Sequence, residues 1–175
     1  MAGSSECRLQ IMLRPFRIAE PIGSTIVRVM AVQVFRHQHR VTYAECTAGN
    51  HIYYSRYLDL LEAARGEFFR HLGAPFLRWQ QEDTIFPVIE CRLRYKGAAR
   101  YDDVLALEVW LTEVGRVRLD FAYRVLNQEN RELIVGSTFH ACTSSSDKPK
   151  RLPEDLARAL APYLHKSDSA LDPRA

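Results

Sequence analysis

Apolar and polar residues alternate in several stretches of the chain, and each alternation predicts a β-strand. The first stretch runs from Val32 to Tyr43, and one side of it carries Phe35, His37, His39, Val41 and Tyr43. Four more stretches follow, with apolar positions at Ile89, Cys91, Leu93 and Tyr95; at Leu105, Leu107, Val109 and Leu111; at Val117, Leu119, Phe121, Tyr123 and Val125; and at Leu133, Val135, Ser137 and Phe139. Short links rich in Gly, Asp and Asn join these four, which predicts an antiparallel meander.

Between the first two alternations the apolar period changes to that of a helix. From about Tyr54 to Leu72 the apolar residues are Tyr57, Leu58, Leu61, Ala64, Phe68, Phe69 and Leu72. Gly73 and Pro75 then supply the usual residues of a helix end. The polar residues up to Asp83 predict no element, and Pro153 opens a last amphipathic helix that reaches about His165.

This order predicts an α+β domain, in which a five-stranded antiparallel sheet curls around one long helix. One helix cannot cover such a sheet, so we expect a second subunit to bury the rest and a homodimer to form. The domain spans residues 31–165. Residues 1–30 form an irregular, mildly basic N-terminal extension, and residues 166–175 form a polar tail. The extension resembles a transit peptide, and the alternative is an over-extended start before a natural beginning at Met30.

Composition narrows the class of protein. The chain has 175 residues, of which 47% are hydrophobic and 26% charged, and no apolar run approaches the ~18 residues of a membrane span. The four cysteines show no zinc-finger or disulfide spacing; they are Cys7, Cys46, Cys91 and Cys142. We therefore expect a cytoplasmic protein with reduced thiols, no metal and no resident cofactor.

The net charge of +3 gives no reason to expect nucleic-acid binding. Residues 1–30 hold four arginines and two glutamates, 4 − 2 = +2, so only +1 belongs to the rest of the chain. Within the domain the basic residues gather locally, at Arg92, Arg94, Lys96 and Arg100. This run suits a ligand that carries a few phosphates, and the alternative is a solvated strand face.

The segment from Tyr43 to Leu58 is the strongest candidate for chemistry. Glycine-rich phosphate loops, nucleophile elbows and HExxH motifs are absent from the sequence. Here a strand leads through a loop with Gly49 into the start of the most apolar helix, where unpaired N–H groups favour an oxygen that gains negative charge. Thr47 is a candidate to hold water or substrate, or else it satisfies turn backbone. His51 is a candidate acid or base, or else a loop histidine bonded to backbone.

Glu62 is the candidate general base on this helix. It lies eight residues after Tyr54, about 12 Å along the axis at ~1.5 Å per residue, at the edge of the apolar stripe. Partial burial there would raise its pKa toward the range of a base. If two such helices pack antiparallel across a dimer axis, Glu62 of one approaches Tyr54 of the other. The alternative is an ion pair with Arg65, three residues on.

An ordered set of short motifs resembles the 4-hydroxybenzoyl-CoA thioesterase family of hotdog-fold acyl-CoA thioesterases, including its Tol-Pal-associated branch. The resemblance runs from about Val32 to Leu160, and its motifs are Val41-Thr-Tyr-Ala-Glu45, Tyr53-Tyr-Ser-Arg-Tyr-Leu58, Glu62-Ala-Ala-Arg65, Pro87-Val-Ile-Glu90, Arg100-Tyr-Asp-Asp103, Leu111-Thr-Glu-Val114 and Gly136-Ser-Thr138. It implies a hotdog fold, dimers that often pair into tetramers, and thioester hydrolysis at the dimer interface.

The resemblance also implies roles for single residues, with one departure. This branch carries a catalytic aspartate where the chain has Thr47, so that role does not transfer. The family's oxyanion-binding amide corresponds to the N–H of Tyr54. Glu62 falls where a second branch of hotdog thioesterases keeps its helical base, and Glu45 is the reserve carboxylate. Thioesterases of enediyne polyketide synthesis also lack the aspartate.

The sequence thus predicts an acyl-thioester hydrolase that acts on acyl-CoA or on an acyl carrier protein. CoA or pantetheine enters only as part of the substrate, near the run from Arg92 to Arg100. The two alternatives are a catalytically silent acyl-thioester-binding dimer, suggested by Thr47, and a polyketide-type carrier-protein thioesterase.

Overall fold

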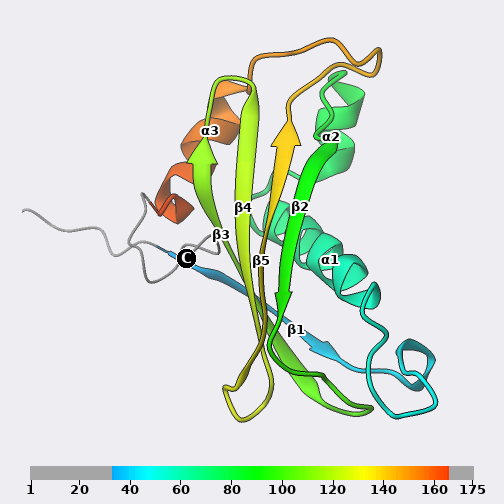
Figure 1. Ribbon diagram of the computed structural model, residues 1–175. Coiled ribbons are helices and arrows are strands. Elements are labelled where there is room, and N and C mark those ends of the chain that lie inside the picture. The colour runs from blue at the N-terminus through cyan, green and yellow to red at the C-terminus, as the bar shows by residue number, and fades with distance from the viewer. Residues whose placement is uncertain (1–32, 166–175) are drawn as a thin grey trace, which may run out of the picture.

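The computed structural model describes residues 33–165, and its centre is one five-stranded antiparallel sheet (Figure 1). The strands are β1 (Phe35–Arg40), β2 (Val88–Tyr95), β3 (Val104–Val114), β4 (Arg118–Leu126) and β5 (Glu132–Ala141). They are ordered β1-β3-β4-β5-β2 across the sheet. The predicted α+β class and five-stranded sheet are confirmed. The extension 1–30 and the tail 166–175 lie outside the described residues.

The predicted four-strand meander is wrong for β2, which pairs with β5 at the far edge instead of with β3. The edge of β3 that β2 would need is occupied by β1, in a register that places Phe35 opposite Val109. The eight residues 96–103 between β2 and β3 form a crossing loop that bonds to other segments. Its Ala99 carbonyl, for example, accepts the Ile52 N–H at 3.0 Å.

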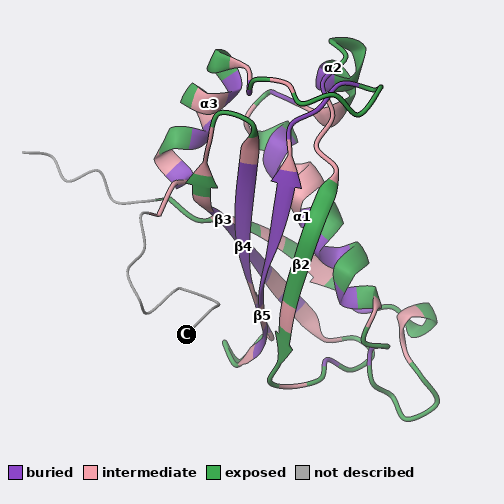
Figure 2. Ribbon diagram, turned by 45° about the horizontal axis from the view of Figure 1, so that its top comes forward, coloured by how far each residue is buried: buried purple, intermediate pink, exposed green. Residues whose placement is uncertain are grey.

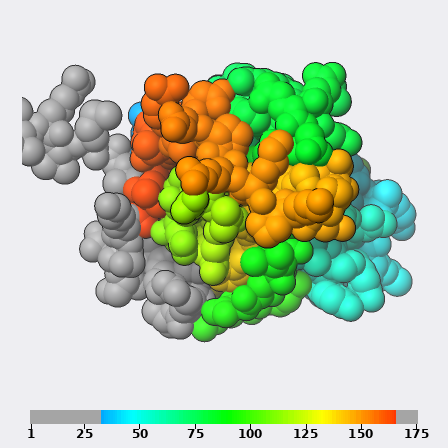
Figure 3. Space-filling model, turned by 90° about the horizontal axis from the view of Figure 1, so that it is seen from above, coloured from blue at the N-terminus to red at the C-terminus, as the bar shows by residue number. Residues whose placement is uncertain are grey.

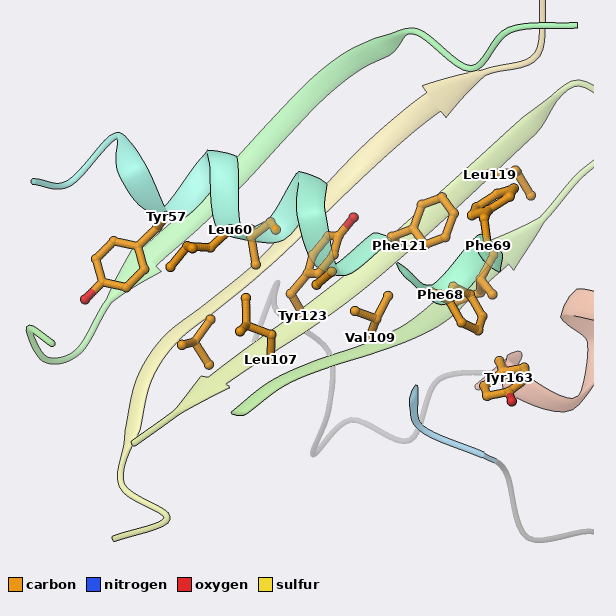
Figure 4. Packing of buried hydrophobic residues seen from close by; sticks show 14 of the residues in the cluster. Tyr57, Leu60, Phe68, Phe69, Leu107, Val109, Leu119, Phe121, Tyr123 and Tyr163 are labelled. Atoms are coloured by element: carbon orange, nitrogen blue, oxygen red, sulfur yellow. The ribbon is translucent and has the colours of Figure 1, made fainter. Parts of the chain in front are cut away.

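The long helix α1 (Arg56–His71) lies against one face of the sheet (Figure 1). Its buried residues are Tyr57, Leu60, Leu61, Ala64, Phe68 and Phe69. They pack on the helix-facing side chains of β3 and β4, among them Leu107, Val109 and Phe121 (Figure 4). The helix ends where Gly73 adopts φ 68°, as its sequence predicts. Leu58, expected in the apolar stripe, is 42% exposed.

The face that β5 turns toward α1 is also different from the predicted one. Phe121 and Tyr123 of β4 stand opposite Thr138 and Gly136, so the even-numbered residues of β5 face the helix. The apolar alternation Leu133, Val135, Ser137 and Phe139 therefore lies on the other face of the sheet. Polar residues are tolerated beneath the helix because they are hydrogen-bonded there, as the contacts of Thr138 show.

Short elements lie at both ends of the sheet (Figure 1). They are η1 (Tyr43–Glu45), α2 (Phe76–Gln81), α3 (Glu154–Leu160) and η2 (Ala161–Tyr163). The last two confirm the predicted C-terminal helix, whereas Tyr43 lies in η1, 80% exposed, and does not belong to the first strand. No helix among residues 33–165 is long and apolar enough to cross a membrane.

Helix α2 was not predicted, because six residues are too few to show a helical period. A local hydrogen bond holds it in place, in which Trp79 donates from Nε1 to the Ala74 carbonyl at 2.9 Å. The Lys150 ammonium caps its C-terminal end through the carbonyls of Glu82 and Asp83. Figure 3 shows the segment after β5, in orange, packed beside α2, in green.

Strand β2 is the exposed edge of the sheet (Figure 2). Every residue of β2 is exposed except Leu93, which is half-buried. Val88 and Ile89 are 50% and 60% exposed. An edge strand with free backbone groups and apolar side chains is a surface on which another strand pairs.

Gly136 allows β2 to approach β5. A Cβ atom at Gly136 would lie 2.6 Å from the Arg92 carbonyl oxygen, closer than backbone atoms tolerate. We expect Gly136→Ala to lower the free energy of unfolding by about 1–3 kcal/mol in urea denaturation. In Gly66→Ala, the control in the middle of α1, the new Cβ meets Arg70 at an ordinary 3.5 Å. That change should raise stability by up to about 1 kcal/mol. Equal effects of the two substitutions would contradict the role given to Gly136.

Candidate active site

The N-terminal end of α1 presents backbone N–H groups that have no partner in the described part of the chain. The N-cap residue Ser55 makes no side-chain capping bond, and the Tyr54 N–H has no hydrogen-bond acceptor among the described residues. The Tyr54 carbonyl, in contrast, accepts a bond from the Tyr95 hydroxyl at 3.2 Å, which fixes this peptide against β2. An exposed N–H at the positive end of a helix dipole is suited to bind an oxygen that gains negative charge.

A tight turn before the helix brings Thr47 and His51 together. The Thr47 N–H donates to the His51 carbonyl at 2.8 Å, and Asn50 closes the turn with φ 55°. A Cβ placed on Gly49 would lie 3.8 Å from the Thr47 hydroxyl and 3.6 Å from His51 Nδ1, so both side chains flank that residue. Both are exposed. The turn therefore offers a hydroxyl and an imidazole close to the start of α1.

Arg100 lies beside this turn. The neighbouring Tyr101 N–H donates to the Asn50 side chain at 3.1 Å. The Ala99 N–H donates to the Tyr57 hydroxyl at 2.9 Å and so ties the 96–103 loop to α1. The loop thereby holds an exposed guanidinium on the same end of the domain as Tyr54.

The other three basic candidates lie elsewhere. The register of β2 turns Cys91 and Leu93 toward α1, so Arg92, Arg94 and Lys96 occupy the opposite face of the sheet. Arg92 pairs with Glu90 and Lys96 with Glu132, each at 2.6 Å. The structure thus separates Arg100 from the other three, whose part in ligand binding stays a prediction.

Glu62 lies on the exposed side of α1, so the partial burial expected for it is absent in one protomer. The alternative ion pair with Arg65 is absent too. No carboxylate of residues 33–165 pairs with Arg65, and Glu62 has no ion-pair partner. Glu62 lines a shallow groove of about 470 Å³ along the helix. The neighbouring carboxylates Asp59 and Glu67 are each paired with an arginine of α1.

His37 reaches the same groove. The alternation of β1 places it on one face with Phe35 and His39 but does not show that the groove along α1 extends to it. Within the described part of the chain, no group of three or more His, Cys, Asp or Glu side chains could hold a metal ion.

Glu45, the reserve carboxylate, has a structural role. Its carboxylate accepts bonds from the Thr42 backbone N–H at 2.6 Å and from the Thr42 hydroxyl at 2.8 Å, and His39 lies 2.9 Å away. Burial alone would raise the pKa of Glu45, but these hydrogen bonds bring it below its ordinary value. A carboxylate so stabilised in its charged form is a weak base.

One protomer does not bring the candidates together. Tyr54, Thr47 and His51 lie at the start of α1, whereas Glu62 is about 12 Å farther along the helix. A base must lie within hydrogen-bond reach of the water it activates. Two protomers with antiparallel α1 helices would place the two groups side by side.

Comparison with known proteins agrees with this fold. Residues 49–134 match the model of the thioesterase superfamily. The acyl-CoA thioester hydrolase YbgC of Escherichia coli is 30% identical over 128 residues, which are 73% of this chain and 96% of that protein.

Solved structures of similar proteins share the fold. A hypothetical protein from Thermus thermophilus is 34% identical, with a TM-score of 0.68 over 73% of this chain and 98% of its own. The dynemicin thioesterase, 18% identical, shares the fold with a TM-score of 0.72 over 77% and 100% of the two chains. The sequence match to YbgC along nearly its whole length shows that this chain belongs to the thioesterase superfamily.

Proposed function

We propose that the protein hydrolyses acyl-CoA thioesters in a site shared by two protomers. The observation that carries this proposal is the Tyr54 N–H, which has no acceptor among residues 33–165 and lies at the start of α1 beside exposed aromatic and apolar side chains. The 30% identity to an acyl-CoA thioester hydrolase supports the substrate class.

In the proposed reaction the thioester oxygen accepts a hydrogen bond from the Tyr54 N–H, and the helix dipole stabilises the charge that develops on it. Glu62 of the partner subunit takes a proton from water as the water oxygen attacks the carbonyl carbon. The tetrahedral intermediate then breaks its C–S bond, and the thiolate takes up the proton. Thr47 and His51 orient the water or the substrate. The products are a carboxylic acid and free CoA.

The exposed edge of β2 is the surface through which we expect the homodimer to form. Antiparallel pairing of two β2 strands would satisfy the free backbone groups of both edges and cover Val88 and Ile89. The same pairing would bring the exposed side of α1 near β2, with Leu58 on it and Glu62 at its margin, next to the partner helix. Burial by the partner would then raise the pKa of Glu62 toward the range of a base.

The phosphates of CoA would lie outside this cleft, near Arg100. A carrier-protein pantetheine arm would enter by the same route. No resident cofactor is needed, because water, an amide and a carboxylate suffice for hydrolysis. The cytoplasmic location of the protein stays a prediction.

A single substitution tests the base. Glu62→Gln keeps the shape of the side chain but removes the group that takes the proton, so kcat for acyl-CoA hydrolysis should fall by about two orders of magnitude or more. Thiol release from short, long and aromatic acyl-CoAs measures this. Asp59→Asn, on the same face of α1, is the control and should change kcat by less than about threefold.

Unchanged turnover in Glu62→Gln would remove Glu62 from the mechanism. If the wild type binds acyl-CoA but releases no thiol, and Thr47→Asp gains activity, the silent-binding alternative replaces this proposal.

Arg100 is tested through KM. Arg100→Gln should raise KM for acyl-CoA severalfold and leave kcat within about twofold, because a phosphate contact outside the reacting centre contributes to binding alone. Arg158→Gln on α3, an exposed arginine at the other end of the sheet, is the control. An unchanged KM in Arg100→Gln would place the CoA phosphates elsewhere. Arg92→Gln would then test whether they bind on the face of the sheet that points away from α1.

A further inference from the structure

A chain of hydrogen bonds runs beneath α1 from Arg65 to His140. Arg65 Nη1 donates to the Tyr123 hydroxyl at 3.1 Å, and this hydroxyl lies 2.9 Å from Thr138 Oγ1. Thr138 Oγ1 lies 2.8 Å from His140 Nε2, and His140 Nδ1 lies 3.0 Å from the Phe86 carbonyl oxygen. All of these side chains are buried except that of Arg65, which is half-buried. Tyr123 occupies the core below the helix (Figure 4).

The Phe86 carbonyl, at the His140 end of this series of hydrogen bonds, fixes the direction of each bond. The Phe86 carbonyl only accepts, so His140 carries its proton on Nδ1 and accepts on Nε2. Thr138 therefore donates to His140 and accepts from Tyr123. Tyr123 has then used its one proton, so its oxygen accepts from Arg65. The hydrogen bonds hold the guanidinium in one orientation, and its other N–H groups have no acceptor among residues 33–165.

The groups next to Arg65 do not neutralise its charge. Burial, and then the charge of Arg65 itself, lower the pKa of His140 to about 4, so the imidazole is neutral at pH 7. Burial raises the pKa of Tyr123 and of Cys91, so both keep their protons at pH 7. No carboxylate of residues 33–165 pairs with Arg65. A half-buried cation without a counter-charge is costly, and the cost falls when an anion binds.

Arg65 is placed where the acyl group of the proposed substrate would end. It lies eleven residues after Tyr54, about 16 Å along the axis, and helix side chains lean toward the N-terminus, which shortens this gap. Its charge acts on Cys91 of β2, and it lies on the same side of α1 as Leu58 and next to Glu62, because residues three and four apart are neighbours on a helix. An acyl chain bound at the Tyr54 N–H and extended along this side reaches the guanidinium.

We propose that Arg65 determines specificity by binding a carboxylate at the far end of the acyl group, so that the preferred substrates are thioesters of dicarboxylic acids. This rests on the proposed thioester hydrolysis and adds the substrate class. A planar guanidinium binds a carboxylate through two parallel N–H bonds. Tyr123, Thr138 and His140 are positioning residues, because they hold Arg65 and do not touch the ligand.

Two thioesters of equal length test this proposal. Suberoyl-CoA carries a terminal carboxylate where octanoyl-CoA ends in a methyl group. The wild type should show a kcat/KM at least about tenfold higher for suberoyl-CoA, and Arg65→Gln should abolish or reverse that preference. Arg70→Gln, an exposed arginine of the same helix that pairs with Glu67, is the control and should keep it.

A second variant separates positioning from folding. Thr138→Val keeps the shape of the side chain but interrupts the hydrogen-bond chain. It should raise KM for suberoyl-CoA and leave KM for octanoyl-CoA nearly unchanged, which a general loss of structure would not do.

An equal kcat/KM for the two thioesters in the wild type would overturn the proposal. A dimer that dissociates in Arg65→Gln, with the suberoyl preference intact, would also overturn it and would show that Arg65 pairs with a carboxylate of the partner subunit. Calorimetric titration with free suberate and octanoate gives the same comparison without turnover. If neither thioester is hydrolysed, the proposed function fails, while Arg65-dependent binding of suberate alone would still support this inference.

Discussion

The burial of one face of α1 against the sheet is the constraint on which the rest of the structure depends. Tyr57, Leu61 and Phe68 are nearly inaccessible to solvent, so the rotation of the helix about its axis is fixed. That rotation turns Glu62 outward into the groove and Arg65 toward β2. The start of α1 is fixed in turn, because the Tyr57 hydroxyl accepts a bond from the 96–103 loop and the Tyr54 carbonyl accepts one from Tyr95.

Charge is distributed around this helix in a way that separates structural groups from available ones. Asp59, Glu67 and Glu45 are each held by nearby partners. Glu62 and Arg65 have no ion-pair partners within the described residues. Together with the Tyr54 N–H, which has no acceptor among residues 33–165, Glu62 and Arg65 are polar groups of the kinds that hydrolysis of a thioester needs.

Much of this fold is predictable from local patterns, and what is not depends on contacts across the sheet. The period of α1, its end at Gly73 and the alternation of β3 and β4 follow from the sequence. The position of β2 does not, because strand order depends on β1 having already occupied the edge of β3. The helix-facing side of β5 was predicted wrongly because Thr138 and His140 look like surface residues until Tyr123 is placed opposite them. The sequence predicts Arg65 only as a partner of Glu62, because spacing shows neighbours on one helix and does not show a hydroxyl on another strand.

The central claim is that each active site takes its oxyanion donor from one protomer and its base from the other. The most direct measurement mixes two inactive variants, Tyr54→Pro, which removes the N–H, and Glu62→Gln, after each has been shown to fold and to dimerise. Unfolding and refolding the two together in equal amounts makes half of the dimers mixed, and each mixed dimer contains one intact site, so the account predicts about a quarter of the wild-type activity. If the mixture is as inactive as its two components, the site lies within one protomer and the account is contradicted.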